Sequence, residues 1–224
     1  MFPPYQEKGR RKLCRSNEAR SGIPECCCGR LYSHGAAFYS PKGATVKRPA
    51  VFLDRDNTLN IDPGYLSDPD SVELFPDVPE GLARLKERGF LLIVLSNQSG
   101  IGRGYFTEKE VMSVNEKINA LLPEEASIDA FYFCPHTPEA ECSCRKPAPG
   151  LLEAACRDYD IDLGHSYMVG DKESDVLLGR QAGLGTVLIN RSPGKRATEA
   201  DREASSFAGA VDWILTHFSR EDNS

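Results

Sequence analysis

The sequence predicts an α/β fold, namely a doubly wound parallel sheet with helices on both faces. Short apolar runs rich in strand-forming residues alternate with longer amphipathic segments typical of helices, which is the order of elements in parallel sheets. Several of the runs end abruptly in acidic, hydroxyl or amide residues. Because the carboxyl ends of parallel strands meet at one edge of a sheet, these polar ends predict a common site there.

The expected elements follow one another along residues 49–218. We expect strands at residues 50–53, 90–95, 130–133, 166–169 and 185–189, and helices at residues 78–88, 107–122, 150–159, 176–182 and 208–218. Gly89 ends the first helix, and a capping box of Thr107 and Glu110 begins the second. These elements fill most of the intervals between the polar strand ends, so no large cap domain is expected.

The first expected strand ends in two carboxylates, Asp54 and Asp56, separated by one residue. Side chains two positions apart on an extended chain point to the same side, so both acids could act on one reacting centre. Two carboxylates so close in a buried site need a cation, or a raised pKa on one of them. Taken alone, the pattern is equally compatible with a strand-end turn whose acids only face water.

Further polar groups follow at the later strand ends. Ser96 follows the second strand, Arg145 and Lys146 precede a helix, and Asp171 follows the fourth strand. Phosphoryl transfer uses such a set: a carboxylate nucleophile, carboxylates that hold a metal ion, and a hydroxyl and an ammonium that neutralise phosphate oxygens. The pattern therefore favours a phosphoryl-transfer enzyme.

Several motifs of the chain together resemble one known superfamily. The motifs are DRDNTLN, DPGY, SNQSGIGRGYF, CPH, CSCRKP and YMVGDKESD. In this order they resemble the haloacid dehalogenase (HAD) superfamily of aspartate-nucleophile phosphatases, which has a Rossmann-like core. Over about residues 49–218 they resemble more closely the D-glycero-D-manno-heptose 1,7-bisphosphate 7-phosphatase family, of which the histidinol-phosphate phosphatases are a related branch.

The resemblance implies a phosphatase that removes the C7 phosphate of heptose 1,7-bisphosphate in the biosynthesis of nucleotide-activated heptose for lipopolysaccharide or surface glycans. It implies Asp54 as the nucleophile that forms an aspartyl-phosphate, and Asp56 as the general acid and base. Ser96 and Lys146 are implied to hold the phosphate oxygens. Mg²⁺ is the implied cofactor, with Asp54, Asp171 and the main-chain carbonyl of Asp56 as its ligands.

Candidate substrate-binding residues surround these groups. By resemblance Asp62, Gly64 and Tyr65 touch the sugar, and an inert turn is the alternative for this segment. Arg103, flanked by glycines, could reach a second phosphate or could be a solvated loop residue. The complete expected set is Arg55, Asp62, Gly64, Tyr65, Asn97, Gln98, Ser99, Arg103, Arg145 and Lys172.

Three thiols and an imidazole form a candidate zinc loop, made of Cys134, His136, Cys142 and Cys144. Such a closed set suits structural Zn²⁺, and disulfides are the alternative. Zinc here would hold the two cations that follow in register with the phosphate. The short spacing from His136 to Cys142 is the form found in the histidinol-phosphate phosphatases, whereas the other motifs favour the heptose family.

Residues 1–48 differ in composition from the rest of the chain. They carry ten Lys/Arg and three Asp/Glu, a net charge of +7, whereas residues 49–224 carry seventeen and thirty, a net charge of −13. We expect a poorly ordered basic extension there and a tail at residues 219–224. The cysteines at 14 and 26–28 lack the paired spacing of zinc sites, and the basic segment lacks the interleaved aromatic residues of a nucleic-acid-binding arm.

The expected partner is a small sugar phosphate, with neither nucleic acid nor membrane. We expect a cytoplasmic monomer, because no apolar stretch is long enough to cross a bilayer and the free thiols of a metal loop suit a reducing compartment. A non-catalytic, zinc-stabilised binding module is the alternative from another class, but such a protein would have no reason to keep all the catalytic residue types. Asn57 stands where the family usually has Gly, and Asn tolerates a positive φ.

Overall fold

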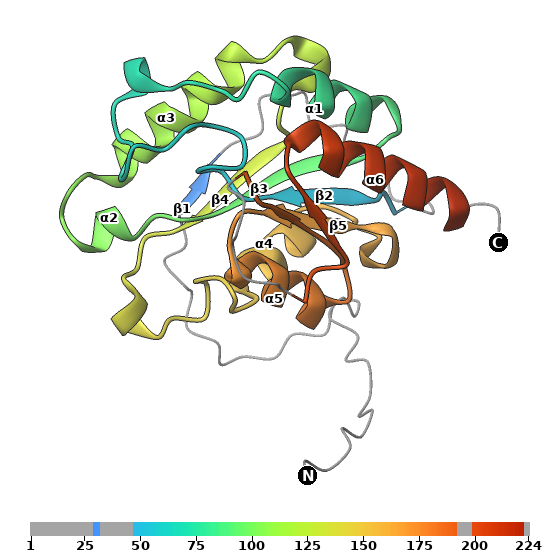
Figure 1. Ribbon diagram of the computed structural model, residues 1–224. Coiled ribbons are helices and arrows are strands. Elements are labelled where there is room, and N and C mark those ends of the chain that lie inside the picture. Colours follow the sequence, from blue (N-terminus) through green and yellow to red (C-terminus); the bar gives the residue numbers. More distant parts are fainter. Residues whose placement is uncertain (1–28, 32–46, 192–198, 222–224) are drawn as a thin grey trace, which may run out of the picture.

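One sheet organises the described part of the chain, which comprises residues 29–31, 47–191 and 199–221 of the computed structural model. Within these ranges, seven strands lie in the order β1-β4-β3-β2-β5-β6-β7 (Figure 1). The strands are β1 (Gly29–Leu31), β2 (Ala50–Leu53), β3 (Leu91–Asn97), β4 (Ala130–Cys134), β5 (Tyr167–Gly170), β6 (Gly185–Ile189) and β7 (Arg202–Ala204). The doubly wound α/β fold predicted from the sequence is confirmed.

Strands β2 to β7 all run parallel to one another, and β1 pairs antiparallel with β4 at the outer edge. The chain first adds β3 and β4 on one side of β2, and then β5 and β6 on the other. The connection after β2 leads to a helix on one face, and the connection after β5 leads to a helix on the opposite face (Figure 1). The carboxyl ends of β2 and β5 therefore form a topological switch point, the usual place of ligand sites in such sheets.

Helices cover both faces of the sheet (Figure 1). On one face lie α1 (Val78–Glu87), α3 (Glu108–Leu121) and α6 (Phe207–Glu221), and on the other lie α4 (Gly150–Asp158) and α5 (Glu173–Ala182). Shorter elements are α2 (Ser99–Gly102) and the 3-10 turns η1 (Pro69–Ser71), η2 (Glu124–Ala126), η3 (Pro138–Ala140) and η4 (Leu163–His165). Within residues 47–191 no large domain is inserted between the strands, as expected.

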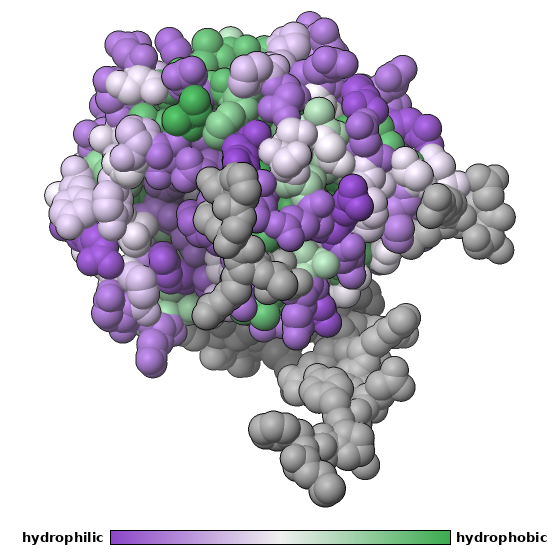
Figure 2. All heavy atoms as spheres, viewed as in Figure 1, coloured by the Kyte–Doolittle hydropathy of each residue, from purple (hydrophilic) through white to green (hydrophobic). Residues whose placement is uncertain are grey.

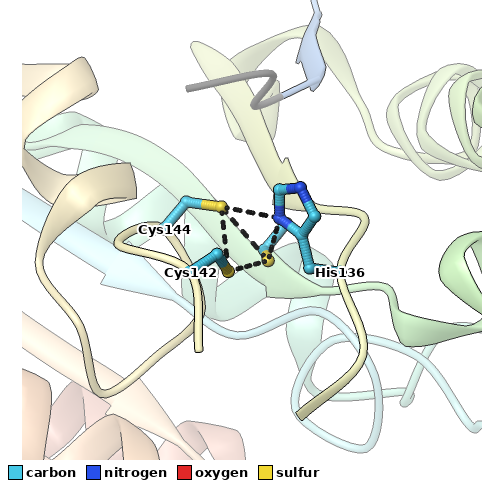
Figure 3. Close-up of side chains that lie close together, drawn as sticks. His136, Cys142 and Cys144 are labelled. Atoms are coloured by element: carbon cyan, nitrogen blue, oxygen red, sulfur yellow. Dashed lines mark hydrogen bonds between the residues drawn. The ribbon is translucent and has the colours of Figure 1, made fainter. Parts of the chain in front are cut away.

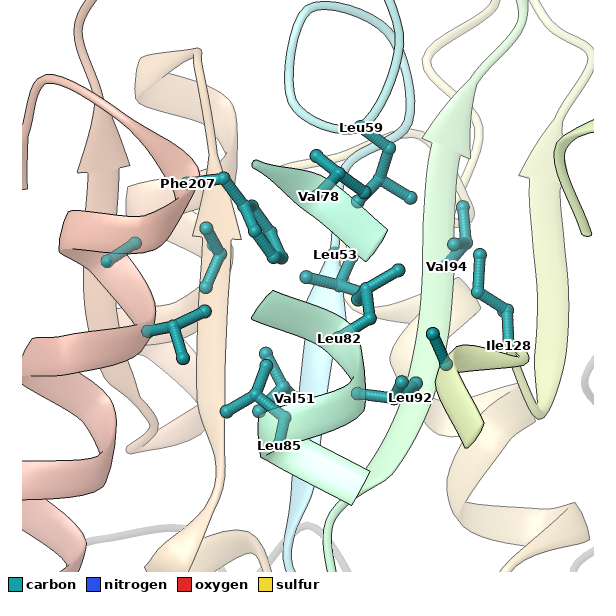
Figure 4. Packing of buried hydrophobic residues seen from close by; sticks show 14 of the residues in the cluster. Val51, Leu53, Leu59, Val78, Leu82, Leu85, Leu92, Val94, Ile128 and Phe207 are labelled. Atoms are coloured by element: carbon teal, nitrogen blue, oxygen red, sulfur yellow. The ribbon is translucent and has the colours of Figure 1, made fainter. Parts of the chain in front are cut away.

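The central strand β2 is buried along its whole length. Val51 and Leu53 join the hydrophobic cluster beneath α1, α3 and α6, whereas Ala50 and Phe52 join the cluster beneath α4 and α5. Figure 4 shows the first of these layers, with Leu82 of α1 lying beside Leu53. A continuous apolar run is what a parallel strand covered on both faces requires. This packing fixes the point at which the chain reaches Asp54.

Four features of the backbone were not expected from the sequence. Strand β1 lies inside the segment expected to be poorly ordered, although residues 1–28 and 32–46 of that segment, including its cysteines, lie outside the described residues. Helix α6 continues to Glu221, so residues 219–221 are helical and not part of a tail. Strand β7 and helix α2 also had no sequence signal of their own. Each of these elements is short or extends an expected one.

The face of the molecule seen in Figure 2 is mostly hydrophilic. Hydrophobic residues appear on it in small groups, the largest of them between the positions of α3 and α1 in Figure 1. Among the described residues, no helix combines the length and the apolar character that crossing a bilayer demands.

Candidate active site

Lys146 and two carboxylates form a buried ionic cluster at the carboxyl edge of the sheet. The Lys146 ammonium lies 2.6 Å from Asp54 Oδ1, at the end of β2, and 2.7 Å from Asp175 Oδ1, in α5. It also donates a hydrogen bond of 2.5 Å to the Leu95 carbonyl of β3. Burial alone would lower the pKa of Lys146, but Asp175 and Asp54 raise it above its usual value. The ammonium is therefore charged and held by three elements at once.

Asp171, directly after β5, completes a cluster of three carboxylates with Asp54 and Asp175. Oxygens Asp54 Oδ2 and Asp171 Oδ1 are buried and accept no hydrogen bond. Burial and the nearby Asp54 charge raise the pKa of Asp171 to about 7, and burial also raises the pKa of Asp175. Buried carboxylate oxygens without donors are costly unless a cation neutralises them. The donor set therefore fits a hard divalent cation such as Mg²⁺.

The position of Asp175 depends on a glycine. The turn between β5 and α5 brings its Oδ2 to the main-chain N–H of Lys172, a 3.1 Å hydrogen bond. A Cβ atom at Gly170 would lie 2.2 Å from the same oxygen. Gly170 therefore allows the carboxylate to lie against the end of β5, beneath Lys146.

Asp56 is held separately from this cluster by three donors. The Arg55 guanidinium donates to both of its oxygens, at 2.9 and 3.0 Å. The side-chain amides of Gln98 and Asn60 donate at 2.8 and 3.3 Å. Burial alone would raise the pKa of Asp56, but the Arg55 charge and these hydrogen bonds hold it below its ordinary value. Asp56 is therefore ionised at neutral pH in the ligand-free protein.

Arg55 uses its guanidinium within the protein, and its expected contact with a substrate stays a prediction. The residue is 1% exposed, and besides its two bonds to Asp56 it donates from Nη1 to Asn115 Oδ1 of α3 at 3.1 Å. A guanidinium in this fork geometry fixes a carboxylate in two directions. Arg55 therefore positions Asp56, and Asn115 positions Arg55.

Asn97 and Gln98 also use their side-chain amides within the protein. Asn97 Nδ2 donates to the Lys146 carbonyl at 3.2 Å, and Asn97 Oδ1 accepts from the Lys146 N–H at 3.0 Å. Gln98 Nε2 donates to Asp56 Oδ2 and, at 2.6 Å, to Ser96 Oγ. Both amides therefore fix the positions of Lys146, Asp56 and Ser96, and their expected contacts with a substrate stay predictions.

The expected sugar-binding loop is shaped by Asp62. Its Oδ1 accepts hydrogen bonds from the N–H groups of Gly64, at 3.0 Å, and Leu66, at 3.2 Å. Gly64 and Tyr65 both have positive φ angles, of 108° and 60°. The side chain of Tyr65 is left half-exposed. Asp62 thus acts on the loop itself, whereas Tyr65 is presented to solvent.

The remaining expected substrate-binding residues lie around the same edge. The Arg103 guanidinium lies 3.9 Å from Glu139, Arg145 donates to the His136 carbonyl at 3.2 Å, and the exposed Lys172 ammonium lies 3.7 Å from Asp171. Ser99 is partly exposed at the start of α2. Their contacts with a substrate stay predictions.

Cys134, His136, Cys142 and Cys144 converge between β4 and α4 (Figure 3). Neighbouring donor atoms are 3.2 to 3.5 Å apart, and the thiols are not joined by disulfides. The centre of a tetrahedron with such edges lies about 2 Å from each corner, close to the bond lengths of zinc. Hydrogen bonding from Cys144 lowers the pKa of Cys134 to about 5, which favours the metal-binding thiolate. The disulfide alternative is therefore wrong for this structure, and the site fits a tetrahedral metal ion.

Comparisons with known proteins agree with this geometry. The HAD-hydrolase-like family model matches residues 143–218. The D-glycero-β-D-manno-heptose-1,7-bisphosphate 7-phosphatase of Yersinia pestis is 42% identical over 175 residues, which cover 75% of this chain and 89% of the relative. The enzyme of the same name from Escherichia coli K12 is 40% identical over 176 residues, covering 75% and 88%. The chain belongs to the heptose bisphosphate phosphatase family.

A solved structure of the same family agrees with the assignment. The D,D-heptose 1,7-bisphosphate phosphatase of B. bronchiseptica, complexed with magnesium and phosphate, superposes with a TM-score of 0.68 at 29% identity, covering 75% of this chain and 99% of that one. As a member of the heptose bisphosphate phosphatase family, this chain is a phosphoric monoester hydrolase. Membership removes the basis for the non-catalytic alternative.

The structure adds residues to the site that sequence reasoning missed. Asn60 and Asn115 lie outside the recognised catalytic positions, but both help to hold Asp56, directly or through Arg55. Arg191, after β6, lies with its guanidinium carbon 3.6 Å from the centre of the Phe75 ring and donates to the Thr58 carbonyl at 3.4 Å. Asn60 ends the DRDNTLN motif, which is the signal that could have found it, whereas Asn115 and Arg191 lie outside every motif of the sequence analysis.

Proposed function

We propose that this protein is a Mg²⁺-dependent phosphatase that removes the C7 phosphate of D-glycero-D-manno-heptose 1,7-bisphosphate. The names of the relatives and the magnesium and phosphate in the solved homologue support the substrate and the cofactor. The observation that carries the proposal is the division of labour between two acids. Lys146 holds Asp54 next to Asp171, and each of these carboxylates keeps one buried oxygen without a hydrogen-bond donor. Arg55 and Gln98 hold Asp56 apart from that cluster.

The proposed reaction uses both acids. Asp54 attacks phosphorus, the bond from phosphorus to the sugar oxygen breaks, and an aspartyl-phosphate forms. Asp56 gives a proton to the leaving oxygen, then takes one from the water whose oxygen attacks phosphorus and releases phosphate and Asp54. Because Asp56 is ionised in the ligand-free protein, it must first bind a proton, which a monoanionic phosphate ester can deliver. Ser96 and Lys146 contact the phosphate oxygens throughout.

The metal ion belongs to this proposal through its ligands. Asp54, Asp171 and the main-chain carbonyl of Asp56 would hold Mg²⁺, with Asp175 supporting the site from beside Lys146. When bound, the ion supplies positive charge that offsets the carboxylates and the phosphate. The two otherwise unbonded carboxylate oxygens support this assignment.

We assign structural zinc to Cys134, His136, Cys142 and Cys144. The cluster lies directly before Arg145 and Lys146, so an ion there would fix the loop that carries both cations. The hydrogen bond from Arg145 to the His136 carbonyl supports this link. The role proposed for zinc is therefore folding of the loop and not chemistry.

Substrate recognition is proposed for the exposed loops. The candidates are Asp62, Gly64, Tyr65, Ser99, Arg103, Arg145 and Lys172, with Asp62 acting through the shape of its loop. Arg103 is suited to the second phosphate because its guanidinium is only loosely paired, at 3.9 Å, with the exposed Glu139. We further propose a monomer that acts in the cytoplasm, in the pathway to nucleotide-activated heptose for lipopolysaccharide or surface glycans. The free thiols of the zinc loop favour such a reducing compartment.

Histidinol phosphate is the second candidate substrate, favoured by the short spacing from His136 to Cys142. Phosphate release from both compounds, measured with Mg²⁺, separates the two candidates. We expect release from heptose 1,7-bisphosphate, lost in Asp54→Asn. Release from histidinol phosphate alone would overturn the substrate assignment, and unchanged release in Asp54→Asn would overturn the nucleophile.

A further inference from the structure

Two exposed tyrosines contact each other, one from the loop that follows β2 and the other from the segment that follows β3 and α2. Tyr65 follows β2 and is 49% exposed, and Tyr105 follows β3 and α2 and is 62% exposed. Their rings meet edge to face, with centroids 4.9 Å apart and planes at 85°. Large apolar side chains that stay in water usually have a binding function when they gather in one place.

The same two loops also contact each other at their base. There the Gln98 side chain, at the end of β3, donates to Asp56, just beyond β2. The loops are therefore joined twice, once at the general acid and base and once at the tyrosine pair.

Tyr65 is held by hydrogen bonds that lead back to the catalytic loop. The N–H of Asp62 donates to Asn57 Oδ1 at 3.3 Å, and Asp62 in turn accepts from the N–H groups on both sides of Tyr65. Asn57 itself has a φ angle of 62°, as its place in the sequence predicted. The loop therefore has a defined shape in the protein without substrate.

Tyr105 is held by packing on the neighbouring residue. Phe106 is 6% exposed and packs with Val111 of α3 and Phe133 of β4. A Cβ atom at Gly100 would lie 2.2 Å from the Phe106 ring, so the ring lies directly against the backbone of α2. The Tyr105 N–H also donates to the Gly100 carbonyl at 2.9 Å. Tyr105 is therefore exposed although its main chain is fixed.

We propose that Tyr105 joins Tyr65, already a substrate-binding candidate, in a rigid aromatic wall that binds the carbohydrate part of the substrate, and that Tyr105 is a specificity-determining residue. The inference rests on the proposed function. Aromatic faces contact the C–H groups of sugars, and neither phenol hydroxyl has a hydrogen-bond partner among the described residues, so both are available to sugar hydroxyls. Because the wall exists before substrate binds, little conformational entropy is lost on binding.

The test compares a phosphosugar with p-nitrophenyl phosphate, which lacks the sugar. We expect Tyr105→Ala to lower kcat/KM for heptose 1,7-bisphosphate about tenfold, mainly through KM, and to change kcat/KM for p-nitrophenyl phosphate less than about twofold. Tyr105→Phe keeps the ring but loses the hydroxyl, and should lower kcat/KM for the phosphosugar less than Tyr105→Ala does. Leu121→Ala, which truncates another exposed apolar side chain, is the matched control.

The double variant Tyr65→Ala with Tyr105→Ala tests whether the pair acts as a unit. Its loss of kcat/KM for the phosphosugar should be close to that of the more damaging single variant, because either truncation removes the wall. Fully additive losses, an equal loss on both substrates, or no loss on the phosphosugar would each overturn the inference. If wild type releases no phosphate from the heptose compound, the substrate assignment fails. The changes in kcat/KM are then measured with the phosphosugar that wild type hydrolyses fastest, again relative to p-nitrophenyl phosphate.

Discussion

Asn97 binds the main chain of Lys146 through both ends of its side-chain amide. Nδ2 donates to the Lys146 carbonyl at 3.2 Å, and Oδ1 accepts from the Lys146 N–H at 3.0 Å. This pair ties the end of β3 to the segment that follows the Cys/His cluster. The Lys146 ammonium then reaches Asp54 at 2.6 Å.

Replacing Asn97 should therefore impair catalysis without contact to the reacting atoms. We expect Asn97→Ala to lower kcat by roughly 10- to 100-fold, because displacing a catalytic cation by about 1 Å can cost that much. Asn97→Asp keeps the acceptor oxygen and loses the donor N–H group, so its kcat should lie between those of wild type and Asn97→Ala. Steady-state kinetics with Asn119→Ala, a change in α3, as a control would measure this effect, and equal kcat values for all four proteins would contradict it.

Replacing Arg55 should cost stability as well as activity. Arg55→Met removes the charged partner of the largely buried Asp56, which keeps only Gln98 and Asn60 as donors, and removes the donor to Asn115, so we expect the free energy of unfolding to fall by roughly 3 kcal/mol. Arg84→Met removes the exposed ion pair with Asp212 and should cost less than about 1 kcal/mol. Urea denaturation of both variants at neutral pH makes the comparison.

The Arg55 effect should also depend on pH. The folded pKa of Asp56 lies below its unfolded value of about 3.9, so its stabilisation is fully present above that value and is lost as the pH falls through the folded pKa. The difference between wild type and Arg55→Met should therefore shrink below about pH 4. A constant difference in acid would show that Arg55 acts through packing alone.

Asp171 should make the metal-free protein less stable as the pH rises. Its pKa is raised to about 7 in the folded protein, so between its unfolded value of about 3.9 and that point the folded state binds the extra proton. We expect the Tm of the protein in EDTA to fall by several degrees across this interval. Asp171→Asn should flatten the fall, whereas the exposed Asp70→Asn should not.

Added Mg²⁺ should stabilise the protein more as the pH rises, because it binds the same carboxylate, Asp171. Because a carboxylate must be deprotonated to hold the ion, the Mg²⁺-induced rise in Tm should be larger at pH 8 than at pH 5. Thermal melting with and without Mg²⁺ at the two pH values measures the difference. An equal rise at both would mean that the ion binds elsewhere.

Removing one thiol of the Cys/His cluster should affect metal content, stability and activity together. We expect purified protein to contain about one zinc ion per chain, and Cys142→Ser to lose most of it, with a lower Tm and a lower kcat. Cys156→Ser changes a cysteine outside the cluster and should retain the metal. Elemental analysis of both variants decides the matter, and zinc retained in Cys142→Ser would remove that thiol from the ligand set.

The sequence predicted the fold where local pattern decides it. Each of the five expected strands is an apolar run buried in the sheet, and the capping box of Thr107 and Glu110 opens α3 as expected. The location of the site was also predictable, because a parallel sheet brings the carboxyl ends of its strands together at one edge. Strands β1 and β7 were not predictable, since each has three residues and depends on a neighbouring strand for its pairing.

The support beneath the catalytic groups was not predictable for a different reason. Arg55 was expected among the substrate-binding residues, but its guanidinium donates to Asn115 of α3, sixty residues further along. Asn97 and Gln98 were expected to add hydrogen-bond donors for the substrate, but in this structure they bond to Lys146, Asp56 and Ser96. Local pattern indicates which groups are polar, and only the tertiary contacts decide which of them remain available to a ligand.

Strand β1 covers an edge that the rest of the sheet leaves open. Without the pairing of Gly29–Leu31, β4 would be the outermost strand, and its residues Ala130–Cys134 would present unpaired backbone groups beside a buried apolar sequence. Such edges promote association with other chains. A recombinant form that begins near residue 47 should therefore self-associate more readily than the full chain, from the very strand that delivers Cys134.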